Sequence, residues 1–137
     1  MPERRRPCGK CGKNRAERFF TPRGRICMFC KRDKRRRSTK DRRLNETYGI
    51  SMEDYDRILA LQGGKCAICK GTRKVYDVDH DHAAERDGLP TRMTVRGLLC
   101  RRCNKRLLPA SKDDVQILAN AIVYLQRPPA RRLLLSG

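Results

Sequence analysis

The sequence has little of the material from which a small protein builds an ordinary hydrophobic core. It contains no tryptophan, and aromatic residues make up 5% of the chain. In residues 1–30 the large apolar side chains are essentially Phe19, Phe20, Ile26, Met28 and Phe29. A unit of this size and composition buries too little apolar surface to fold unaided. We therefore expect the N-terminal part to depend on a bound metal for its fold.

Long apolar runs are also absent. No stretch approaches the roughly eighteen apolar residues of a membrane-spanning helix, and no apolar targeting segment follows the opening Met1-Pro-Glu-Arg-Arg-Arg6. These absences argue against a membrane-spanning or secreted protein. We expect the protein to work in a reducing cytoplasm.

Acidic residues are scarce beside basic ones, with 15 Asp and Glu against 34 Lys and Arg and a formal net charge of +19. A short chain with this charge repels itself unless it meets a polyanion, and nucleic acid is the expected partner. An anionic membrane surface is the alternative, but we find no basic amphipathic helix with an aromatic face. The charge is concentrated in residues 1–43, which hold eighteen Lys and Arg against four Asp and Glu.

The densest basic run is 31–37, in which six of seven residues are positive. Such a run is often only a solvated helix face, but this density favours a segment that follows phosphates. The residues predicted to contact nucleic acid are those of this run and one arginine in the second half: Lys31, Arg32, Lys34, Arg35, Arg36, Arg37 and Arg96.

All eight cysteines lie in four Cys-x-x-Cys pairs: Cys8/Cys11, Cys27/Cys30, Cys66/Cys69 and Cys100/Cys103. Two thiolates in one tight turn grip an ion from one side, and two such turns complete a tetrahedral zinc site. A disulfide scaffold is the alternative in a secreted domain, and a redox Cys-x-x-Cys would not need four copies. The spacing predicts two structural zinc ions, one on the first four cysteines and one on the last four.

The chain is predicted to comprise four parts. Residues 1–37 form a zinc ribbon, with a hairpin through Arg18-Phe19-Phe20, followed by a basic arm. Residues 38–62 are helical linker, 63–127 form the second zinc unit, and 128–137 are a basic tail. In the linker, Ser38-x-x-Asp41 resembles a capping box, Gly49 can end the first helix, and Ser51-x-x-Asp54 opens another.

Within the second zinc unit, alternation predicts strands over 75–78 and 93–99, joined by a polar loop at 83–92. Gly63-Gly64 ends the preceding helix. A short helix is expected from Cys100, and a last one from Ser111-x-x-Asp114 to Pro128-Pro129.

Chemistry-bearing residues gather around the last two cysteine pairs, where Asp79-His80-Asp81-His82 lies between the pairs and Asn104 follows the last cysteine. Each has an ordinary interpretation, since an asparagine here can simply satisfy a turn and an Asp-His pair can be surface polarity. Their co-occurrence favours phosphodiester hydrolysis. An imidazole is the natural base near neutral pH. The oxygens of Asp79 and Asn104 suit a hard cation such as Mg²⁺.

Four motifs follow one another along the chain: Tyr48-Gly-Ile50, Leu61-Gln-Gly-Gly-Lys-Cys66-Ala-Ile-Cys69, Val78-Asp-His-Asp-His82 and Val95-Arg-Gly-Leu-Leu-Cys100-Arg-Arg-Cys103-Asn104. In this order they resemble the phage recombination endonuclease VII family, a branch of the HNH or His-Me finger nucleases. The resemblance covers about residues 46–126. It implies a ββα-metal unit around a four-cysteine zinc, with catalytic Mg²⁺ on Asp79 and Asn104, His80 as general base and His82 as a further active-site histidine. Mn²⁺ is expected to substitute for Mg²⁺.

Together these observations predict a small, zinc-stabilised α+β protein: a ββα-metal (His-Me finger) nuclease unit with an N-terminal zinc ribbon and flanking helices. The expected function is Mg²⁺-dependent HNH cleavage of DNA, as a nick or a double-strand cut, by a phage-encoded protein in the host cytoplasm. The alternative is a non-catalytic two-zinc nucleic-acid-binding regulator. DNA is the expected partner, and a homodimer or phage packaging or recombination proteins are the further ones considered.

Overall fold

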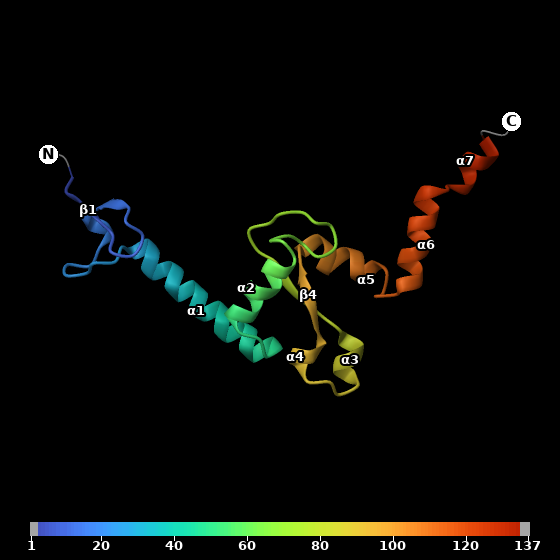
Figure 1. The fold of residues 1–137 in the computed structure, drawn as a ribbon, viewed down its shortest axis with the longest axis horizontal. Helices are drawn as coiled ribbons and strands as arrows, with labels where there is room; N and C mark the ends of the chain where they lie inside the picture. Colours follow the sequence, from blue (N-terminus) through green and yellow to red (C-terminus); the bar gives the residue numbers. More distant parts are fainter. Residues whose placement is uncertain (1–2, 135–137) are drawn as a thin grey trace. The chain divides into compact units, whose positions relative to one another are not determined.

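The computed structural model describes residues 3–134, and the chain divides into two compact units. The first contains the chain up to Arg57 together with Pro90–Met93, and the second contains Ile58–Leu89 and the chain from Thr94 onward. Figure 1 shows their helices and strands in chain order. The protein is of the predicted small α+β kind.

The N-terminal part of the first unit is a hairpin built around the first cysteine pair. Strands β1 (Arg5–Pro7) and β2 (Asn14–Ala16) pair antiparallel, with Arg5 opposite Ala16, and the 3₁₀ turn η1 (Glu17–Phe19) follows. The predicted hairpin through residues 18–20 is therefore misplaced, because the turn that carries the cysteines is itself the hairpin loop. Its small core consists of Cys8, Phe20 and Cys27, with Phe19 and Cys30 packed against them.

Helix α1 (Met28–Tyr48) begins at the second cysteine pair and runs without a break to Gly49. The predicted helix start at Ser38 is wrong, since Ser38 is an exposed mid-helix residue. The unbranched Lys and Arg side chains of the basic run are good helix formers, so the run extends the helix instead of preceding it. Gly49 ends it as predicted, with φ +65° and its N–H donating to the Asn45 carbonyl at 2.9 Å.

Helix α2 (Met52–Leu61) opens with the predicted capping box. The Asp54 N–H donates to Ser51 Oγ at 3.0 Å, and the Ser51 N–H donates to Asp54 Oδ2 at 3.0 Å. Arg92 binds the same carboxylate through two hydrogen bonds of 2.8 and 3.1 Å and donates to the Gly49 carbonyl at 3.0 Å. These bonds explain why a short segment distant in sequence belongs to the first unit. Gly63 and Gly64, both at positive φ, end α2 as predicted.

The centre of the second unit is an antiparallel pair of strands, β3 (Asp77–His80) and β4 (Val95–Leu99). Both strands begin two residues later than predicted, β3 at Asp77 and β4 at Val95. The predicted polar loop is largely occupied by two short helices, α3 (His82–Arg86) and α4 (Thr91–Thr94), and the last two residues of α4 are the first two of the predicted second strand. The core around the strands includes Tyr76, Val78, Leu98 and Leu99, all largely buried. The Tyr76 hydroxyl donates to the Gly64 carbonyl at 2.9 Å, which ties the start of β3 to the end of α2.

The chain after β4 is helical. A π-helical turn, η2 (Cys103–Leu107), in which the Leu108 N–H donates to the Cys103 carbonyl, runs into α5 (Leu108–Ala110). Helix α6 (Val115–Gln126) is capped by Asp114, three residues beyond the predicted Ser111, and Pro129 begins α7 (Pro129–Leu134). The end of the predicted tail, 135–137, lies outside the described residues. No helix among the residues described is both long and apolar enough to cross a membrane.

Candidate metal centres and active site

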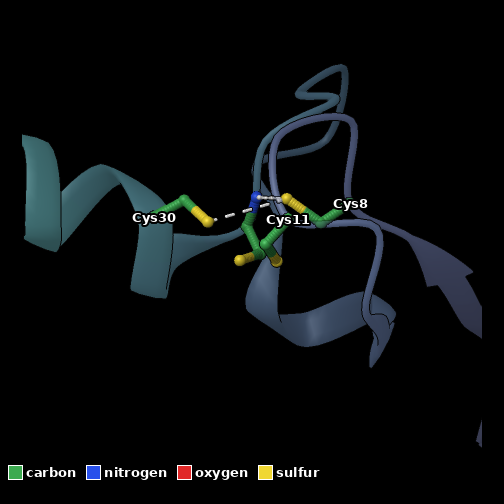
Figure 2. A group of neighbouring side chains, drawn as sticks. Cys8, Cys11 and Cys30 are labelled. Carbon is green, nitrogen blue, oxygen red and sulfur yellow. Dashed lines mark hydrogen bonds between the residues drawn. The ribbon is translucent and has the colours of Figure 1, made fainter.

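The first four-cysteine cluster joins the hairpin loop to the start of α1. The sulfurs of Cys8, Cys11, Cys27 and Cys30 all lie within 4.8 Å of one another, and Cys8 Sγ is 3.9 Å from Cys30 Sγ (Figure 2). A tetrahedron of Zn–S bonds places sulfurs about 3.8 Å apart. The Cys27 N–H donates to Cys8 Sγ at 3.3 Å, and this bond does most to lower the pKa of the Cys8 thiol to about 6. The cluster therefore has the donors and spacing of a structural zinc site.

The second cluster joins the Cys66-x-x-Cys69 turn to the end of β4. Its four sulfurs also lie within 4.8 Å of one another, with Cys69 Sγ 3.7 Å from Cys100 Sγ. Burial opposes ionisation of Cys66, yet N–H donation from Cys100 (3.3 Å to Cys66 Sγ) and from Cys69 lowers the pKa of its thiol to about 6. Cys103, which is 3% exposed, completes the set. None of the eight cysteines is in a disulfide, and their predicted grouping into two sets of four is confirmed.

Asp79 is a buried carboxylate beside an irregularity in the β3–β4 ladder. Asp79 lies opposite Gly97 and His80 opposite Val95, so Arg96 is the extra residue of a β-bulge. Bulges re-aim side chains and recur next to active sites. Arg96 donates hydrogen bonds to both Asp79 oxygens, with Nε 2.8 Å from Oδ2 and Nη2 3.1 Å from Oδ1. Asp79, 8% exposed, is thus neutralised by an arginine from the opposite strand.

Arg96 has a second carboxylate partner, because its Nη2 lies 3.2 Å from Asp113 Oδ2. The hydrogen bonds to Asp79, and then the charges of both carboxylates, raise the pKa of Arg96 further above its already high value. Arg96 is one of the residues predicted to contact nucleic acid, and its pairing with Asp79 and Asp113 is not apparent from the sequence. No sequence signal points to Asp113, which follows η2 and α5 in the chain.

The two histidines of the protein lie together at the end of β3. The ring centroids of His80 and His82 are 4.2 Å apart, and His80 is the less exposed, with 19% of its side chain accessible. Glu85, which is not among the predicted site residues, lies beside them: its Oε2 is 3.5 Å from His80 Nε2 and 3.9 Å from His82 Nδ1. Its spacing of three residues from His82, on a helix capped by Asp81, is the signal that could have identified it.

Asn104 occupies the π-helical turn next to the second cysteine cluster. Its N–H donates to the Cys100 carbonyl at 3.0 Å, and the residue is half-buried. Single π-helical turns occur often at functional sites. Among the described residues, the Asp79 carboxylate is hydrogen-bonded to Arg96 and not to Asn104. The second cluster thus braces the backbone at Asn104, while the bulged strand pair positions Asp79 and His80.

The predicted basic run forms the first half of α1, with every residue from Lys31 to Arg37 exposed. Seven consecutive helical residues span about two turns, so the run surrounds the helix with positive charge. Two of its members have partners within the first unit: Lys31 Nζ lies 3.2 Å from Thr21 Oγ1, and Arg37 forms an ion pair with Asp56. The predicted basic arm is therefore part of helix α1.

Comparison with known proteins covers the second unit and the helices before it. The sequence model of the recombination endonuclease VII family matches residues 41–127. The Gene 59 protein of Mycobacterium phage D29 is 44% identical over 95 residues, which are 67% of this chain and 53% of that protein. The Gene 59 protein of Mycobacterium phage L5 is 41% identical over the same shares of both chains.

The chain therefore spans about half the length of the curated relatives it matches. No solved structure matches it significantly. The matched region contains α2, both strands, the second cysteine cluster, the two histidines and Asn104. Because the family match covers more than half of the chain and agrees with the resemblance seen in the sequence, this protein belongs to the recombination endonuclease VII family.

Proposed function

We propose that the protein is a Mg²⁺-dependent HNH endonuclease of phage origin that hydrolyses phosphodiester bonds of DNA in the host cytoplasm, as a nick or a double-strand cut. The observation that carries this proposal is the family match, which spans Asp79, His80 and Asn104. The juxtaposition of a buried carboxylate and a histidine at a bulged strand end supports it independently. Its curated relatives are phage proteins, which supports the proposed origin.

In this proposal His80 is the general base. Its side chain is partly exposed, at 19%, so an imidazole nitrogen can reach a water beside a bound phosphate. Strand β3 and the Asp81 cap of α3 hold its backbone, since Asp81 Oδ1 accepts the N–H groups of Ala83 and Ala84 at 2.9 and 3.0 Å. A fixed backbone limits the positions of the ring, as general-base catalysis requires. His82, beside it and more exposed, serves as a further active-site histidine.

Asp79 and Asn104 are the residues that would hold Mg²⁺, because one carboxylate and one amide oxygen suit a hard cation better than the neighbouring thiolates do. When bound, this ion would relieve charge on the phosphate and on the leaving oxygen. Arg96 must share or release Asp79 to admit a cation. Asp113, already 3.2 Å from the Arg96 guanidinium, offers it a second partner. Arg96 contacts both carboxylates here, and we infer that it would release Asp79 and keep Asp113 when a cation binds.

Two zinc ions, one in each cysteine cluster, have a structural role in this proposal. Sulfur separations of 3.7 and 3.9 Å match those of a zinc tetrathiolate. Thiolate sites filled by four protein ligands leave no position for substrate. The chemistry is therefore assigned to the oxygen and imidazole groups, and the zinc ions to holding the hairpin and the β3–β4 strands in place.

DNA binding is assigned to the basic run of α1, with Lys34, Arg35 and Arg36 as its centre. A helix ringed by cations follows phosphates without reading base sequence. Residues 1–40 lie outside the family match, so this part adds binding strength to the nuclease unit in the proposed scheme.

A specific observation favours the alternative, a non-catalytic two-zinc nucleic-acid-binding regulator: both oxygens of Asp79 are bound by Arg96. A carboxylate held permanently in this way would not serve a cation. Both functions require zinc and DNA binding, and only the nuclease requires His80, Asp79 and Asn104.

The deciding experiment is cleavage of supercoiled, linear and branched DNA by zinc-loaded protein with Mg²⁺, Mn²⁺ or EDTA. Cleavage should require the divalent ion, and His80→Ala should lower the rate by about 10²–10⁴-fold while DNA binding persists. Asp79→Asn should also lose activity. Asp77→Asn, with the same charge change two residues earlier on β3, should retain it. A parent protein that binds all three DNAs and cuts none would favour the regulator, and equal rates for His80→Ala and the parent would exclude His80 as the base.

A further inference from the structure

The segment after β3 brings three potential metal ligands together outside the two cysteine clusters. His80 ends β3, His82 begins α3, and Glu85 follows one turn later on the same helix. The Asp81 N–H donates to the Thr94 carbonyl at 2.8 Å, and the Glu85 N–H donates to the Asp81 carbonyl at 3.0 Å. The backbone that carries the three side chains is therefore fixed by one hydrogen bond to Thr94, next to β4, and by another within the first turn of α3.

The ligand atoms already lie near the separations that one ion would impose. His80 Nε2 and His82 Nδ1 lie 3.5 and 3.9 Å from Glu85 Oε2, and each of the three residues offers a ligand atom within 4.8 Å of those of the other two. Around a tetrahedral zinc, nitrogen and oxygen ligands about 2.0–2.1 Å from the metal are about 3.3 Å apart. Glu85 and His82 are 43% and 63% exposed, so small rotations can bring the three atoms to these distances.

We propose that His80, His82 and Glu85 form a third metal site, which takes a borderline divalent transition ion such as Zn²⁺ or Ni²⁺. Two imidazoles and one carboxylate on one side of an ion are a recurring transition-metal set that leaves positions open to water. Mg²⁺, which prefers oxygen ligands, would not compete well for the two nitrogens. The site differs from the thiolate clusters in its donors and from the Asp79/Asn104 pair in its residues.

Occupation of this site has a consequence that rests on the proposed nuclease function. A transition ion bound to His80 Nε2 takes up a lone pair of the general base. Binding of Zn²⁺ or Ni²⁺ beyond the two structural zinc ions should therefore inhibit cleavage. Mg²⁺ should not relieve this inhibition, because it binds elsewhere. The histidine pair thus makes the enzyme sensitive to free transition metal.

The test measures Ni²⁺ binding to protein that already carries its two zinc ions, by equilibrium dialysis with elemental analysis of both metals. The parent should take up one Ni²⁺ while keeping two zinc ions. Glu85→Gln and His82→Ala should each weaken this binding at least tenfold, since loss even of an outer-shell partner typically lowers metal affinity about 10–100-fold. Glu46→Gln, the same change at an exposed glutamate of α1, should bind Ni²⁺ like the parent.

Cleavage is measured in parallel at constant Mg²⁺, with each variant compared with its own rate without Ni²⁺. The half-inhibitory Ni²⁺ concentration should rise at least tenfold in Glu85→Gln and not in Glu46→Gln. No Ni²⁺ bound beyond the zinc ions, or binding that neither His82→Ala nor Glu85→Gln weakens, would overturn the proposed site. If Ni²⁺ binds as expected but the protein cuts no DNA, the proposed metal site is supported and the nuclease function is rejected.

Discussion

Replacing Arg96 with methionine tests whether this arginine competes with a cation for Asp79. The substitution removes the guanidinium and keeps an unbranched side chain. Loss of one partner from a fully buried ion pair is strongly destabilising, by about 3–5 kcal/mol. Here the side chain of Asp79 is 10% exposed and that of Arg96 is 34% exposed, so solvent screens part of the interaction. Without Mg²⁺ we expect Arg96→Met to lower the free energy of unfolding by about 1–3 kcal/mol.

The same change should strengthen Mg²⁺ binding. In the parent a cation must displace Arg96 from both oxygens of Asp79, whereas in Arg96→Met the carboxylate is released. A coupling of about 1–3 kcal/mol corresponds to about 5–150-fold in affinity. Because Arg96 keeps Asp113 as a partner when displaced, we expect a value near the lower end, about tenfold. At saturating Mg²⁺ this adds about 1.4 kcal/mol to the stability that the ion confers.

Urea unfolding of zinc-loaded protein with and without Mg²⁺ measures both effects. Arg92→Met is the matched control, because Arg92 grips Asp54 through the same pair of distances, 2.8 and 3.1 Å, in the first unit. It should destabilise the protein without changing the response to Mg²⁺. If Arg96→Met binds Mg²⁺ no more tightly than the parent, or if Arg92→Met gains as much Mg²⁺ affinity, Arg96 does not compete with Mg²⁺ for Asp79.

Three further outcomes are expected at the cysteine clusters, the π-helical turn and the basic helix. Protein purified without chelator should contain two zinc ions per chain, and Cys11→Ser should contain one, since structural zinc contributes about 10–16 kcal/mol of folding free energy in small fingers. Elemental analysis showing fewer than two zinc ions in the parent would contradict this. Asn104→Ala should raise the Mg²⁺ needed for half-maximal cleavage at least tenfold, and Asn104→Asp less, because it keeps an oxygen; zinc released from either variant would mean that Asn104 is structural. Replacing Lys34, Arg35 and Arg36 with glutamine should flatten the plot of log DNA affinity against log salt by about 0.9 for each phosphate that these cations neutralise; an unchanged slope would show that this face of α1 does not touch DNA.

Features that depend on residues within one turn could be predicted from the sequence. The grouping of the cysteines follows from the Cys-x-x-Cys turns, because each turn brings two sulfurs to one side of an ion. The end of α1 at Gly49 and the start of α2 at Ser51 and Asp54 follow from capping bonds that span three or four residues. The resemblance of the second half to the endonuclease VII family, carried by motifs in a fixed order, is likewise a property of the chain alone.

Other features depended on how one element continues into the next and on how distant segments meet. The basic run could have been a loose arm, and it is helical because the helix that starts at Met28 continues through Ser38. Glu85 joins the two histidines only because Asp81 caps a short helix directly after β3. Arg96 reaches Asp79 across 17 residues of sequence because a bulge in β4 sets the pairing of the strands. Strand register and ion pairing are decided by tertiary packing. The sequence by itself therefore determined the grouping of the cysteines and the family, and the tertiary structure determined which charges face the candidate catalytic residues.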